Sequence, residues 1–506
     1  MSKDSFFITT PIYYPSGKPH MGHAYSSIIA DVLARFKRLE GVDVFFLTGT
    51  DEHGLKIQRE AEKNKKETKV FCDELSLKFK ELTKILNLSN DDFIRTTENR
   101  HHKSVEEIWE RLVKSGDIYL DKYSGWYSVS DEAYYDEEEI EKLNNNYVSK
   151  TSGSRVEWVE EESYFFKLSA WSKKLLNHYE DNKDFILPNS RKNEVVNFVK
   201  KGLKDLSVSR TSFSWGIPVP KDKKHVIYVW LDALTNYLSA LNYPDTNNEL
   251  FKNFWPASIH LIGKDILRFH AIYWPAFLLA ANIKLPLKIY GHGWILSGEE
   301  KMSKSRGNIL DPIEIIKEYG SDELRYYLMK DVIFGLDGNI NLDNFKKTIN
   351  DLANNVGNLS NRIFTILDKN FNCRVPETSA GYTINENLLI NKKDFIEIIN
   401  NFELHNYLKK IHSYSSALNK YVNDNEPWNK KANSEQNIKN ILYSTIIGLK
   451  NIFVLLYPIT PRSSISFLKN INIEYEDISL DLINKEFKKN EKLSNPEILF
   501  KKYKCD

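Results

Sequence analysis

The first 50 residues follow a strand, helix, strand pattern that leaves few folds open to the chain. Residues 6–8 are a short apolar run, and apolar side chains then recur with helical spacing over residues 21–39. Gly41 ends this helical pattern, and residues 42–47 form a second apolar run. A strand, a helix and a strand at these separations predict a βαβ unit, whose two strands lie in one parallel sheet.

Three later segments extend this sheet. Residues 259–263 and 287–291 are apolar runs that each end in glycine, and residues 226–229 are a third apolar run. We expect all three to be strands of the second half of the sheet. Ligands of such sheets bind outside the carboxyl ends of the strands. The loop at 9–23 and the segment at 48–54 fall at that edge, so we expect the functional site there.

The remainder of the chain differs in composition. Residues 116–225 hold many aromatic side chains and an acidic stretch at 131–141, which predicts an inserted domain of short strands and helices. From residue 346 onward glycine and proline become rarer and long helical patterns dominate, which predicts a helical bundle. We therefore divide the chain into residues 1–115 and 226–290 for the parallel sheet, 116–225 for the insertion, 291–345 for a connecting region and 346–506 for the bundle.

Charge and cysteine content exclude several classes of protein. The 506 residues carry a formal net charge of +1, which argues against binding nucleic acid by bulk charge but not against a local basic patch. Cys72, Cys373 and Cys505 form no C-x-x-C pair, which argues against a disulfide scaffold or a thiolate metal site. The first residues lack the apolar core of a signal peptide, and the apolar run at 271–283 is too short to span a bilayer. We expect a cytoplasmic protein without membrane attachment.

His20, Gly22 and His23 stand where the first loop meets the first helix. Histidines three residues apart share one face of a helical turn. Gly22 has no side chain, so a flat ring can lie against the backbone, and the helix N-terminus offers N–H groups to a phosphate. The motif alone is weak, because two surface histidines near a helix cap are an equally good interpretation.

A second motif, KMSKS at residues 301–305, follows the last expected strand and lies between two glycines. Lys301 and Lys304, separated by small residues with hydroxyl groups, suit a polyphosphate; a solvated basic loop is the alternative. His-Met-Gly-His after the first strand and Lys-Met-Ser-Lys-Ser after the last form a specific pair. The pair resembles the two signature motifs of class I aminoacyl-tRNA synthetases.

Further segments resemble the methionyl-tRNA synthetase family within that class, and the resemblance covers nearly the whole chain. These segments are residues 10–14, 48–54, 229–237, 263–266, 269–270, 274–276 and 291–294. The resemblance implies an α/β fold, with a Rossmann-type parallel-sheet catalytic domain, an inserted connective domain and a C-terminal all-α anticodon-binding bundle. It also implies that residues 291–345 hold the KMSKS loop and a region that contacts the tRNA stem.

The resemblance implies a reaction. This is the ATP-dependent ligation of methionine to its cognate tRNA, tRNA(Met), through a methionyl-adenylate, as translation initiation and elongation require. The implied catalytic residues, which stabilise charge on the phosphates and on the leaving pyrophosphate, are His20, His23, Lys301 and Lys304. The implied ATP-binding residues are His20, Gly22, His23, Lys264, Asp265 and Lys304, with Asp265 at the ribose. Mg²⁺ is expected to accompany ATP.

The resemblance also implies a methionine pocket. Asp51 follows the second strand and suits the ammonium group of the amino acid. The implied pocket residues are Ile12, Tyr14, Asp51, Trp230, Ala233, Tyr237, Ile266 and His270. An aromatic floor suits a polarisable sulfur, and the Tyr14 hydroxyl and the His270 ring can add polar selectivity. Core packing is the alternative for each residue, and it is the favoured one for Ile266 and Ala233 taken singly.

The anticodon-reading positions of the family match Asn358, Arg362 and Trp428 by local context. Asn358 and Arg362 are four residues apart and share a helix face, where they can bond to base edges. Trp428 can provide a platform for a base of the single-stranded anticodon. The alternative is ordinary, because a Trp after a Pro often packs between helices.

Two features of some relatives are not expected here. Relatives hold zinc in the insertion through cysteines, but the matching positions are Ser128, Asp131, Ser149 and Ser152, so we expect no zinc. Some relatives append a dimerising tRNA-binding barrel, and the sequence up to Asp506 leaves no room for a barrel of about 100 residues. We therefore expect a monomer.

Three alternatives stay open at this point. A nucleotidylyltransferase shares the first histidine motif and the adenylyl chemistry, but it would not need a helical bundle. Another synthetase is the second alternative: the valine, isoleucine and leucine enzymes carry a large editing insertion, and the cysteine enzyme binds zinc through thiolates that are missing here. The third is a catalytically inactive RNA-binding or amino-acid-sensing protein, against which the charged residues of both motifs argue.

Overall fold

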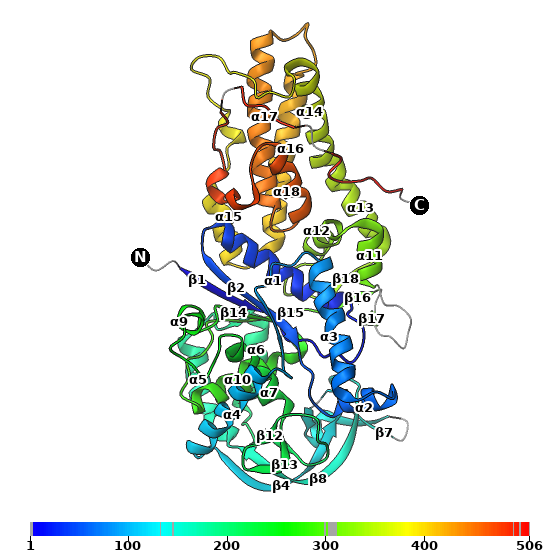
Figure 1. Cartoon of the computed structure of the whole chain (residues 1–506), viewed down its shortest axis with the longest axis vertical. Coiled ribbons are helices and arrows are strands. Elements are labelled where there is room, and N and C mark those ends of the chain that lie inside the picture. The colour runs from blue at the N-terminus through cyan, green and yellow to red at the C-terminus, as the bar shows by residue number, and fades with distance from the viewer. Residues whose placement is uncertain are drawn as a thin grey trace.

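Six parallel strands form the central sheet of the computed structural model, in the order β3-β2-β1-β14-β15-β9 (Figure 1). The structure describes residues 4–131, 133–143, 146–297, 300–301, 311–488, 490–494 and 497–504. The strands are β1 (Ser5–Thr9), β2 (Asp43–Thr50), β3 (Asp92–Arg95), β9 (Ile186–Leu187), β14 (Ile259–Gly263) and β15 (Ile289–His292). Helix α1 (Met21–Leu39) connects β1 to β2, which confirms the predicted βαβ unit.

Alternate residues of the central strands enter two different apolar cores. Phe7 and Phe45 point into one core, and their neighbours Ile8 and Phe46 point into the other, because successive side chains of a strand face opposite sides of the sheet. The core that contains α1 continues into the C-terminal helices. Burial on both faces explains why these strands read as continuous apolar runs rather than as alternating ones.

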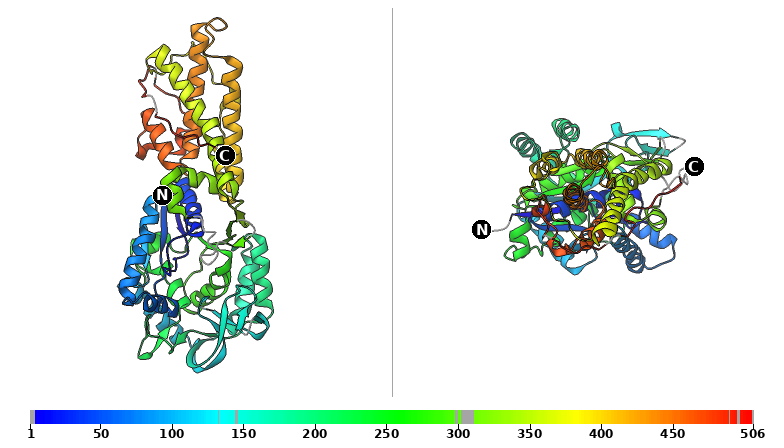
Figure 2. Two further views of the ribbon diagram at one scale, coloured as in Figure 1. Left: turned by 90° about the vertical axis from the view of Figure 1, so that its right-hand side faces the viewer. Right: turned by 90° about the horizontal axis from the view of Figure 1, so that it is seen from above.

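Helices surround the sheet and extend beyond it as a long bundle (Figures 1 and 2). Around the sheet lie α2 (Leu55–Lys63), α3 (Thr68–Ile85), α4 (Asn99–Lys114), α5 (Ser172–Asp181), α6 (Asn189–Lys200), α7 (Val229–Leu234), α8 (Asn236–Ser239), α9 (Glu249–Phe254) and α10 (Trp274–Ala280). Then follow α11 (Pro312–Tyr319), α12 (Ser321–Asp331), α13 (Leu342–Leu352), α14 (Asn358–Phe371), α15 (Lys392–Asn400), α16 (Leu404–Asn425), α17 (Glu435–Leu456) and α18 (Pro461–Asn470). The parallel sheet and the C-terminal helices confirm the predicted fold class.

The expected insertion contains an antiparallel sheet of its own, in the order β5-β4-β8-β7-β6. Its long strands β4 (Ile118–Ser128) and β8 (Arg155–Phe166) pair with each other. The short strands are β5 (Ala133–Tyr135), β6 (Ile140–Leu143), β7 (Asn146–Ser149) and β10 (Leu206–Ser207). Strand β9 belongs to the same stretch of chain but pairs with β15 in the central sheet. The domain division at the residues given above stays a prediction.

Residues 226–229 do not join the central sheet, and that expectation is wrong. Strand β13 (Asp222–Ile227) pairs with β11 (Ser209–Arg210) and β12 (Pro218–Val219) in a separate antiparallel sheet, and α7 begins at Val229. An apolar run this short does not specify which sheet a strand joins. A further small sheet contains β16 (Ile295–Ser297), β17 (Glu300–Lys301) and β18 (Gly338–Asn339).

Helix α17 is the interior helix of the bundle. It is long and apolar enough to cross a membrane by length and composition alone, but 89% of its most apolar window is buried inside the protein. Neighbouring helices cover it; for example, the ring of Phe453 stacks on that of Phe467 in α18 with centroids 3.9 Å apart. A helix that is apolar on all sides is expected where other helices surround it.

A buried ion cluster joins the sheet domain to the helical bundle. Asp31 of α1 accepts hydrogen bonds from Arg35 at 2.8 Å and from Arg325 of α12 at 2.6 Å. Arg35 also donates to the Tyr457 hydroxyl, and Arg325 donates to the carbonyl of Ile459, just beyond α17. Burial alone would raise the pKa of Asp31, but the two guanidinium groups lower it to about 2. The cluster therefore ties α1 to the base of α17.

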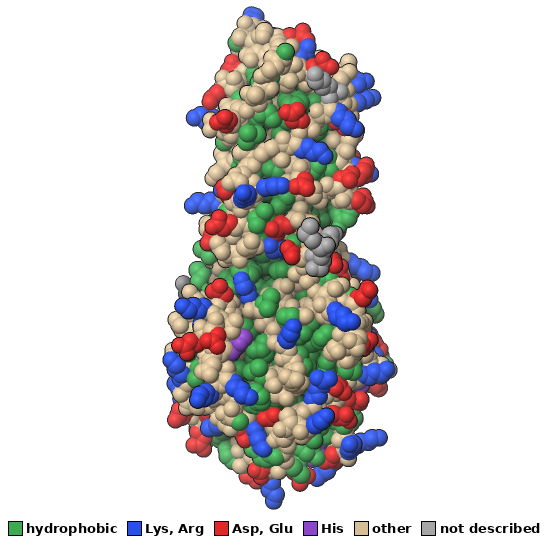
Figure 3. Space-filling model, turned by 90° about the vertical axis from the view of Figure 1, so that its left-hand side faces the viewer, with side chains coloured by type: hydrophobic (Ala, Val, Ile, Leu, Met, Phe, Trp, Pro, Cys, Tyr) green, Lys and Arg blue, Asp and Glu red, His purple; other side chains and the backbone are tan. Residues whose placement is uncertain are grey.

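Charges of both signs cover the protein surface. On the face shown in Figure 3, Lys and Arg side chains are interspersed with Asp and Glu side chains along the whole length of the molecule. This mixture agrees with the net charge of +1.

Candidate active site

His20 and His23 cap the N-terminus of α1 at the carboxyl edge of the sheet. The backbone N–H of Gly22 donates to Nδ1 of His20, and the backbone N–H of His20 donates to Nδ1 of His23, both at 3.1 Å. The two rings stack with centroids 3.6 Å apart. Because both Nδ1 atoms accept, the neutral rings carry their protons on Nε2, which makes each Nε2 a donor suited to a phosphate oxygen.

Gly22 lies directly against the His20 ring. A Cβ at this position would come within 3.1 Å of that ring, which is closer than most side chains tolerate. In this structure the neighbour of the Gly22 backbone is the ring of His20 itself, and the expectation that a ligand's flat ring lies against Gly22 stays a prediction.

Asp51 lies at the end of β2, where its backbone N–H donates to the carbonyl of Tyr13 at 3.0 Å. Its side chain is buried. The hydroxyl of Tyr14 donates to the carbonyl of His53 at 2.9 Å, which holds the Tyr14 ring beside the segment that follows β2. The loop after β1 and the segment after β2 thus lie side by side at the carboxyl edge, where the βαβ pattern predicted both, and hydrogen bonds join them.

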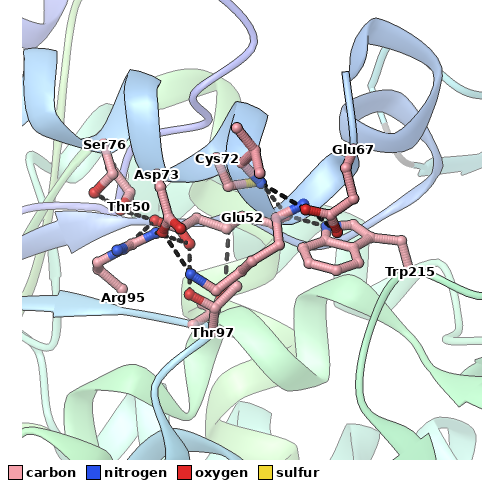
Figure 4. A network of polar contacts seen from close by, with 12 residues as sticks. Thr50, Glu52, Glu67, Cys72, Asp73, Ser76, Arg95, Thr97 and Trp215 are labelled. Atoms are coloured by element: carbon pink, nitrogen blue, oxygen red, sulfur yellow. Dashed lines mark hydrogen bonds and ion pairs between the residues drawn. The ribbon is translucent and has the colours of Figure 1, made fainter. Parts of the chain in front are cut away.

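Glu52 anchors the same segment from its other side (Figure 4). Its buried carboxylate accepts two hydrogen bonds from Arg95, at 2.7 and 2.9 Å, and one each from Thr50 and Thr97. The indole N–H of Trp215 donates to the carbonyl of Glu52 at 2.6 Å. The sequence places Glu52 in the 48–54 segment but does not indicate that it anchors the segment. No local pattern pairs it with Arg95, which lies 43 residues further on.

Most of the residues expected to bind methionine belong to, or pack against, the apolar core on the insertion side of the sheet. Tyr237 is a member of that core, four further residues pack against it while partly exposed, and Ala233 and His270 are buried. The Tyr237 hydroxyl lies 2.7 Å from Nε2 of His270. Trp230 stacks face to face on Phe269 with centroids 3.7 Å apart. The partly exposed members are Ile12, Tyr14, Trp230 and Ile266.

Burial sets the ionisation of the polar groups in this cluster. It lowers the pKa of His270 to about 4, so the ring is neutral near pH 7. Burial likewise raises the pKa of Tyr237 above its usual range. The thioether of methionine carries no charge. A neutral, buried pair of polar groups is therefore a better lining for its pocket than a charged side chain would be.

His260 of β14 is a buried residue that sequence reasoning missed. Its ring stacks on that of Tyr237 with centroids 4.0 Å apart. Nε2 accepts from the indole N–H of Trp274 at 3.3 Å, so Nδ1 carries the proton and donates to the Thr9 hydroxyl at 2.8 Å. The alternation of β14 places this side chain inward, but the sequence does not indicate which ring it supports.

Lys264 and Asp265 follow β14 at the same edge of the sheet. The ammonium group of Lys264 lies 2.6 Å from a carboxylate oxygen of Asp337 and 4.1 Å from the centroid of the Trp294 ring. Trp294 donates its indole N–H to Asp265 at 3.0 Å. Lys264 and Asp265 therefore lie beside the strand ends, where a nucleotide is expected to bind.

The KMSKS lysines are only partly covered by the structure. The backbone of Lys301 belongs to β17, which pairs with β16 after the last strand of the central sheet. Lys304 lies outside the described residues. The roles of both side chains stay predictions.

Arg362 and Trp428 meet on the helical bundle. The Arg362 guanidinium lies over the Trp428 ring, 5.2 Å from its centroid, and donates to the side chain of Asn423 at 2.9 Å. Trp428 is 45% exposed, so it is not packed between helices as the alternative interpretation required. Asn358 is exposed one turn earlier on the same helix, α14.

The positions that match the zinc ligands of relatives do not suit zinc. The Asp131 carboxylate accepts hydrogen bonds from the hydroxyls of Tyr135, Ser152 and Ser154 at 2.5–2.7 Å. The Ser128 and Ser149 hydroxyl oxygens accept from nearby backbone N–H groups. Within the described residues, no three His, Cys, Asp or Glu side chains are grouped so that they could hold a metal. We call Asp131 with its three hydroxyl donors the Asp131 cluster.

Comparison with known proteins agrees with this geometry. The family model described as tRNA synthetases class I (M) matches residues 6–144 and 141–364. The methionine–tRNA ligase of Brucella suis is 47% identical over 92% of this chain and 91% of its own length, and that of Rickettsia prowazekii is 45% identical over 99% and 100%. The structure of Mycobacterium tuberculosis methionyl-tRNA synthetase in complex with methionyl-adenylate is 42% identical, covers 98% of this chain and 99% of its own, and superposes with a TM-score of 0.95.

The fold, the capped helix and these similarities define a class I aminoacyl-tRNA synthetase. Within that class, the chain belongs to the methionyl-tRNA synthetase family.

Proposed function

We propose that the chain ligates methionine to tRNA(Met) at the expense of ATP, with methionyl-adenylate as the intermediate. The observation that carries this proposal is the link between two sites at one sheet edge: the backbone N–H of Asp51 donates to the carbonyl of Tyr13, whose ring lies 4.7 Å from that of His23. The buried pair Tyr237–His270, with Asp51 at the end of β2, suits methionine, and the His20–His23 cap of α1 suits phosphates. Such an arrangement can bring an amino-acid carboxylate to the α-phosphate of ATP.

The first step is displacement at phosphorus. A carboxylate oxygen of methionine bonds to the α-phosphorus, and the bond to the bridging oxygen breaks, so that pyrophosphate leaves. Mg²⁺ that accompanies ATP would offset the charge of its phosphates. His20 and His23 would donate from Nε2 to the phosphate oxygens as negative charge develops on them. Lys264 would contact the nucleotide, Asp265 its ribose, and Lys301 and Lys304 the leaving pyrophosphate. This assignment of roles is supported by the position of the described side chains at the strand ends.

In the second step, a hydroxyl at the 3′ end of the tRNA attacks the carbonyl carbon of the adenylate. The ester bond to the tRNA forms, and AMP leaves. The anticodon would bind Asn358, Arg362 and Trp428 on the bundle, because Trp428 offers an exposed ring and Arg362 lies beside it. Recognition of tRNA and the chemistry would thus occupy opposite parts of an elongated molecule (Figure 1).

Methionine would be recognised at both of its ends. The Asp51 carboxylate would bind the ammonium group, and the rings of Tyr14, Trp230, Tyr237 and His270 would surround the thioether. Contacts between sulfur and aromatic rings are favourable by about 0.3–1.5 kcal/mol each. The neutral state of His270 supports this assignment.

The proposal includes a zinc-free, monomeric enzyme of the cytoplasm. The hydroxyl donors around Asp131 support the absence of zinc, because hydroxyls are poor zinc ligands. Elemental analysis of the purified protein and light scattering test these two properties. Stoichiometric zinc that withstands dialysis, or a dimer that persists on dilution, would contradict them.

ATP–pyrophosphate exchange across the twenty amino acids tests the proposed function. We expect exchange with methionine and little with the other nineteen. Exchange that needs no amino acid would point to a nucleotidylyltransferase, and preference for another amino acid to a different synthetase. Charging of tRNA(Met) with labelled methionine tests the second step, and failure of both assays would favour a catalytically inactive protein.

A further inference from the structure

Asp232 is a fully buried carboxylate that the mechanism above does not use. It lies on α7 between two residues of the expected methionine pocket, Trp230 and Ala233. Two histidines from distant parts of the chain bind its oxygens. Oδ2 lies 2.6 Å from Nδ1 of His53, and Oδ1 lies 2.7 Å from Nε2 of His101 on α4. Both histidines are buried as well.

Hydrogen-bond partners hold the His101 ring on both sides. Nδ1 of His101 lies 3.0 Å from the Ser239 hydroxyl, which also lies 3.0 Å from the Thr235 carbonyl. Nε2 of His101 faces the Asp232 carboxylate, which can only accept, and donates to it. Burial alone would raise the pKa of Asp232, but the adjoining His53 and His101 hold it well below its usual range.

This ion cluster connects the two ends of the expected methionine site. His53 is two residues from Asp51, and its backbone carbonyl accepts the Tyr14 hydroxyl at 2.9 Å. Asp232 is two residues from Trp230 and next to Ala233. The bond between Asp232 and His53 therefore fastens α7, which carries the thioether side of the pocket, to the segment that carries the ammonium-binding carboxylate.

We propose that Asp232 is a positioning residue that sets the distance between Asp51 and the thioether pocket, and so selects an amino acid of methionine's length. His101 would hold the carboxylate in place from the side of α4. Asp232 would not touch the substrate, and it would act only through His53 and α7. The inference rests on the proposed function, since it concerns the recognition of methionine.

The test compares Asp232→Asn with a matched control. An Asn keeps the size of the side chain, but its amide cannot accept from both histidines. The control is Asp31→Asn, which alters an equally buried carboxylate with two cationic partners at the junction with the bundle. Both variants are expected to lower the melting temperature, so a loss of stability does not distinguish them.

The methionine and ATP KM values in the exchange assay do distinguish them. For Asp232→Asn we expect the methionine KM to rise about 10- to 100-fold, because the ammonium group would no longer reach the Asp51 carboxylate while the thioether is bound, and the ATP KM to change less than about twofold. For Asp31→Asn we expect any change to affect both substrates alike. An unchanged methionine KM in Asp232→Asn, or an equal rise of both constants, would overturn the proposal.

Inhibition by 4-(methylthio)butanoate provides a second readout. This acid has the thioether and the carboxylate of methionine but lacks the ammonium group, so the distance to Asp51 does not affect it. Its inhibition constant is expected to stay within about threefold in Asp232→Asn. Equal weakening of the acid and of methionine would mean that the thioether pocket itself has collapsed, which contradicts a spacing role.

A further variant covers the case in which Asp232→Asn does not fold. His101→Gln leaves the carboxylate in place and retains one donor, and we expect the same selective rise of the methionine KM, smaller in size. An unchanged methionine KM in folded His101→Gln would then count against the proposal.

The wild-type assay separates the two hypotheses. Wild type without methionine-dependent exchange refutes the proposed function, whereas active wild type with unaffected variants refutes only the role of Asp232.

Discussion

The hydroxyl of Tyr237 donates a hydrogen bond of 2.7 Å to Nε2 of His270. The direction of this bond follows from the other nitrogen of the ring, because Nδ1 lies 3.0 Å from the Ile266 carbonyl, which can only accept. Both ring nitrogens are therefore engaged by the protein. The orientation of the His270 ring is settled before any ligand binds.

Replacing Tyr237 with Phe should release the His270 ring. Nε2 would then be a buried acceptor without its donor, which costs about 1–3 kcal/mol. We expect the methionine KM in ATP–pyrophosphate exchange to rise on the order of tenfold, with little change in the ATP KM. A methionine KM equal to that of the wild type would show that the pair does not organise the pocket.

The depressed pKa of His270 predicts a loss of stability in acid. Its pKa is about 4 in the folded protein and near 6.5 when unfolded, so between these values only the unfolded chain binds the proton. The free energy of unfolding should therefore fall as the pH falls through this window, by about 1.4 kcal/mol for each unit. In His270→Gln this slope should be shallower than in the wild type when denaturant unfolding is measured from pH 7 to 4. Parallel profiles would mean that His270 is not the group responsible.

Replacing Arg95 with Ala should destabilise the fold. The substitution would leave the fully buried Glu52 carboxylate with two hydroxyl donors and without its guanidinium partner. Breaking a buried pair from one side typically costs about 3–5 kcal/mol. The exposed pair Lys63–Glu60 provides the control, since Lys63→Ala should change the unfolding free energy by less than about 1 kcal/mol. Similar small effects of both substitutions in urea titrations would contradict the role given to the Glu52 network.

Trp428→Ala should separate tRNA recognition from adenylate formation. The exposed ring is expected to stack on an anticodon base, and loss of such a contact costs about 1–3 kcal/mol. We expect weaker charging of tRNA(Met) and a nearly normal rate of ATP–pyrophosphate exchange. If both activities fall together, Trp428 supports the fold of the bundle and does not read the anticodon.

Lys304→Ala tests the KMSKS motif. If Lys304 neutralises the leaving pyrophosphate, its charge matters most in the transition state. The rate of adenylate formation should then fall about 10²–10³-fold, by analogy with the loss of one transition-state donor. The ATP KM should change less. A higher ATP KM with an unaltered rate would instead identify a residue that binds ground-state ATP.

The sequence predicts the βαβ unit well because both of its signals are local. Helical spacing over α1 and the apolar runs of β1 and β2 need no information from elsewhere in the chain. The family resemblance then indicated Tyr237 and His270, which the structure brings into contact. Their burial, which lowers the pKa of His270, depends on segments far apart and could be described only with the fold in hand.

Other features depend on pairings that no local pattern encodes. Asp232 and His101 are 131 residues apart, and Glu52 and Arg95 are 43 apart. Strand β13, which ends at Ile227, pairs with β11 and β12 rather than with the central sheet, because so short an apolar run does not specify its partner. A charged residue within an apolar segment, such as Asp232 between Leu231 and Ala233, was the available sign of a buried ion pair.

The Asp131 cluster lies in the part of the insertion that contacts the segments around the site. Lys56 donates to the Ser130 carbonyl there, and Arg268 forms an ion pair with Glu139. Carboxylate and hydroxyl oxygens are not oxidised by peroxide as thiolates are. Because the hydrogen bonds of the Asp131 cluster and this ion pair need neither a thiolate nor a metal, we expect this part of the insertion to keep its shape in the presence of peroxide or of a chelator.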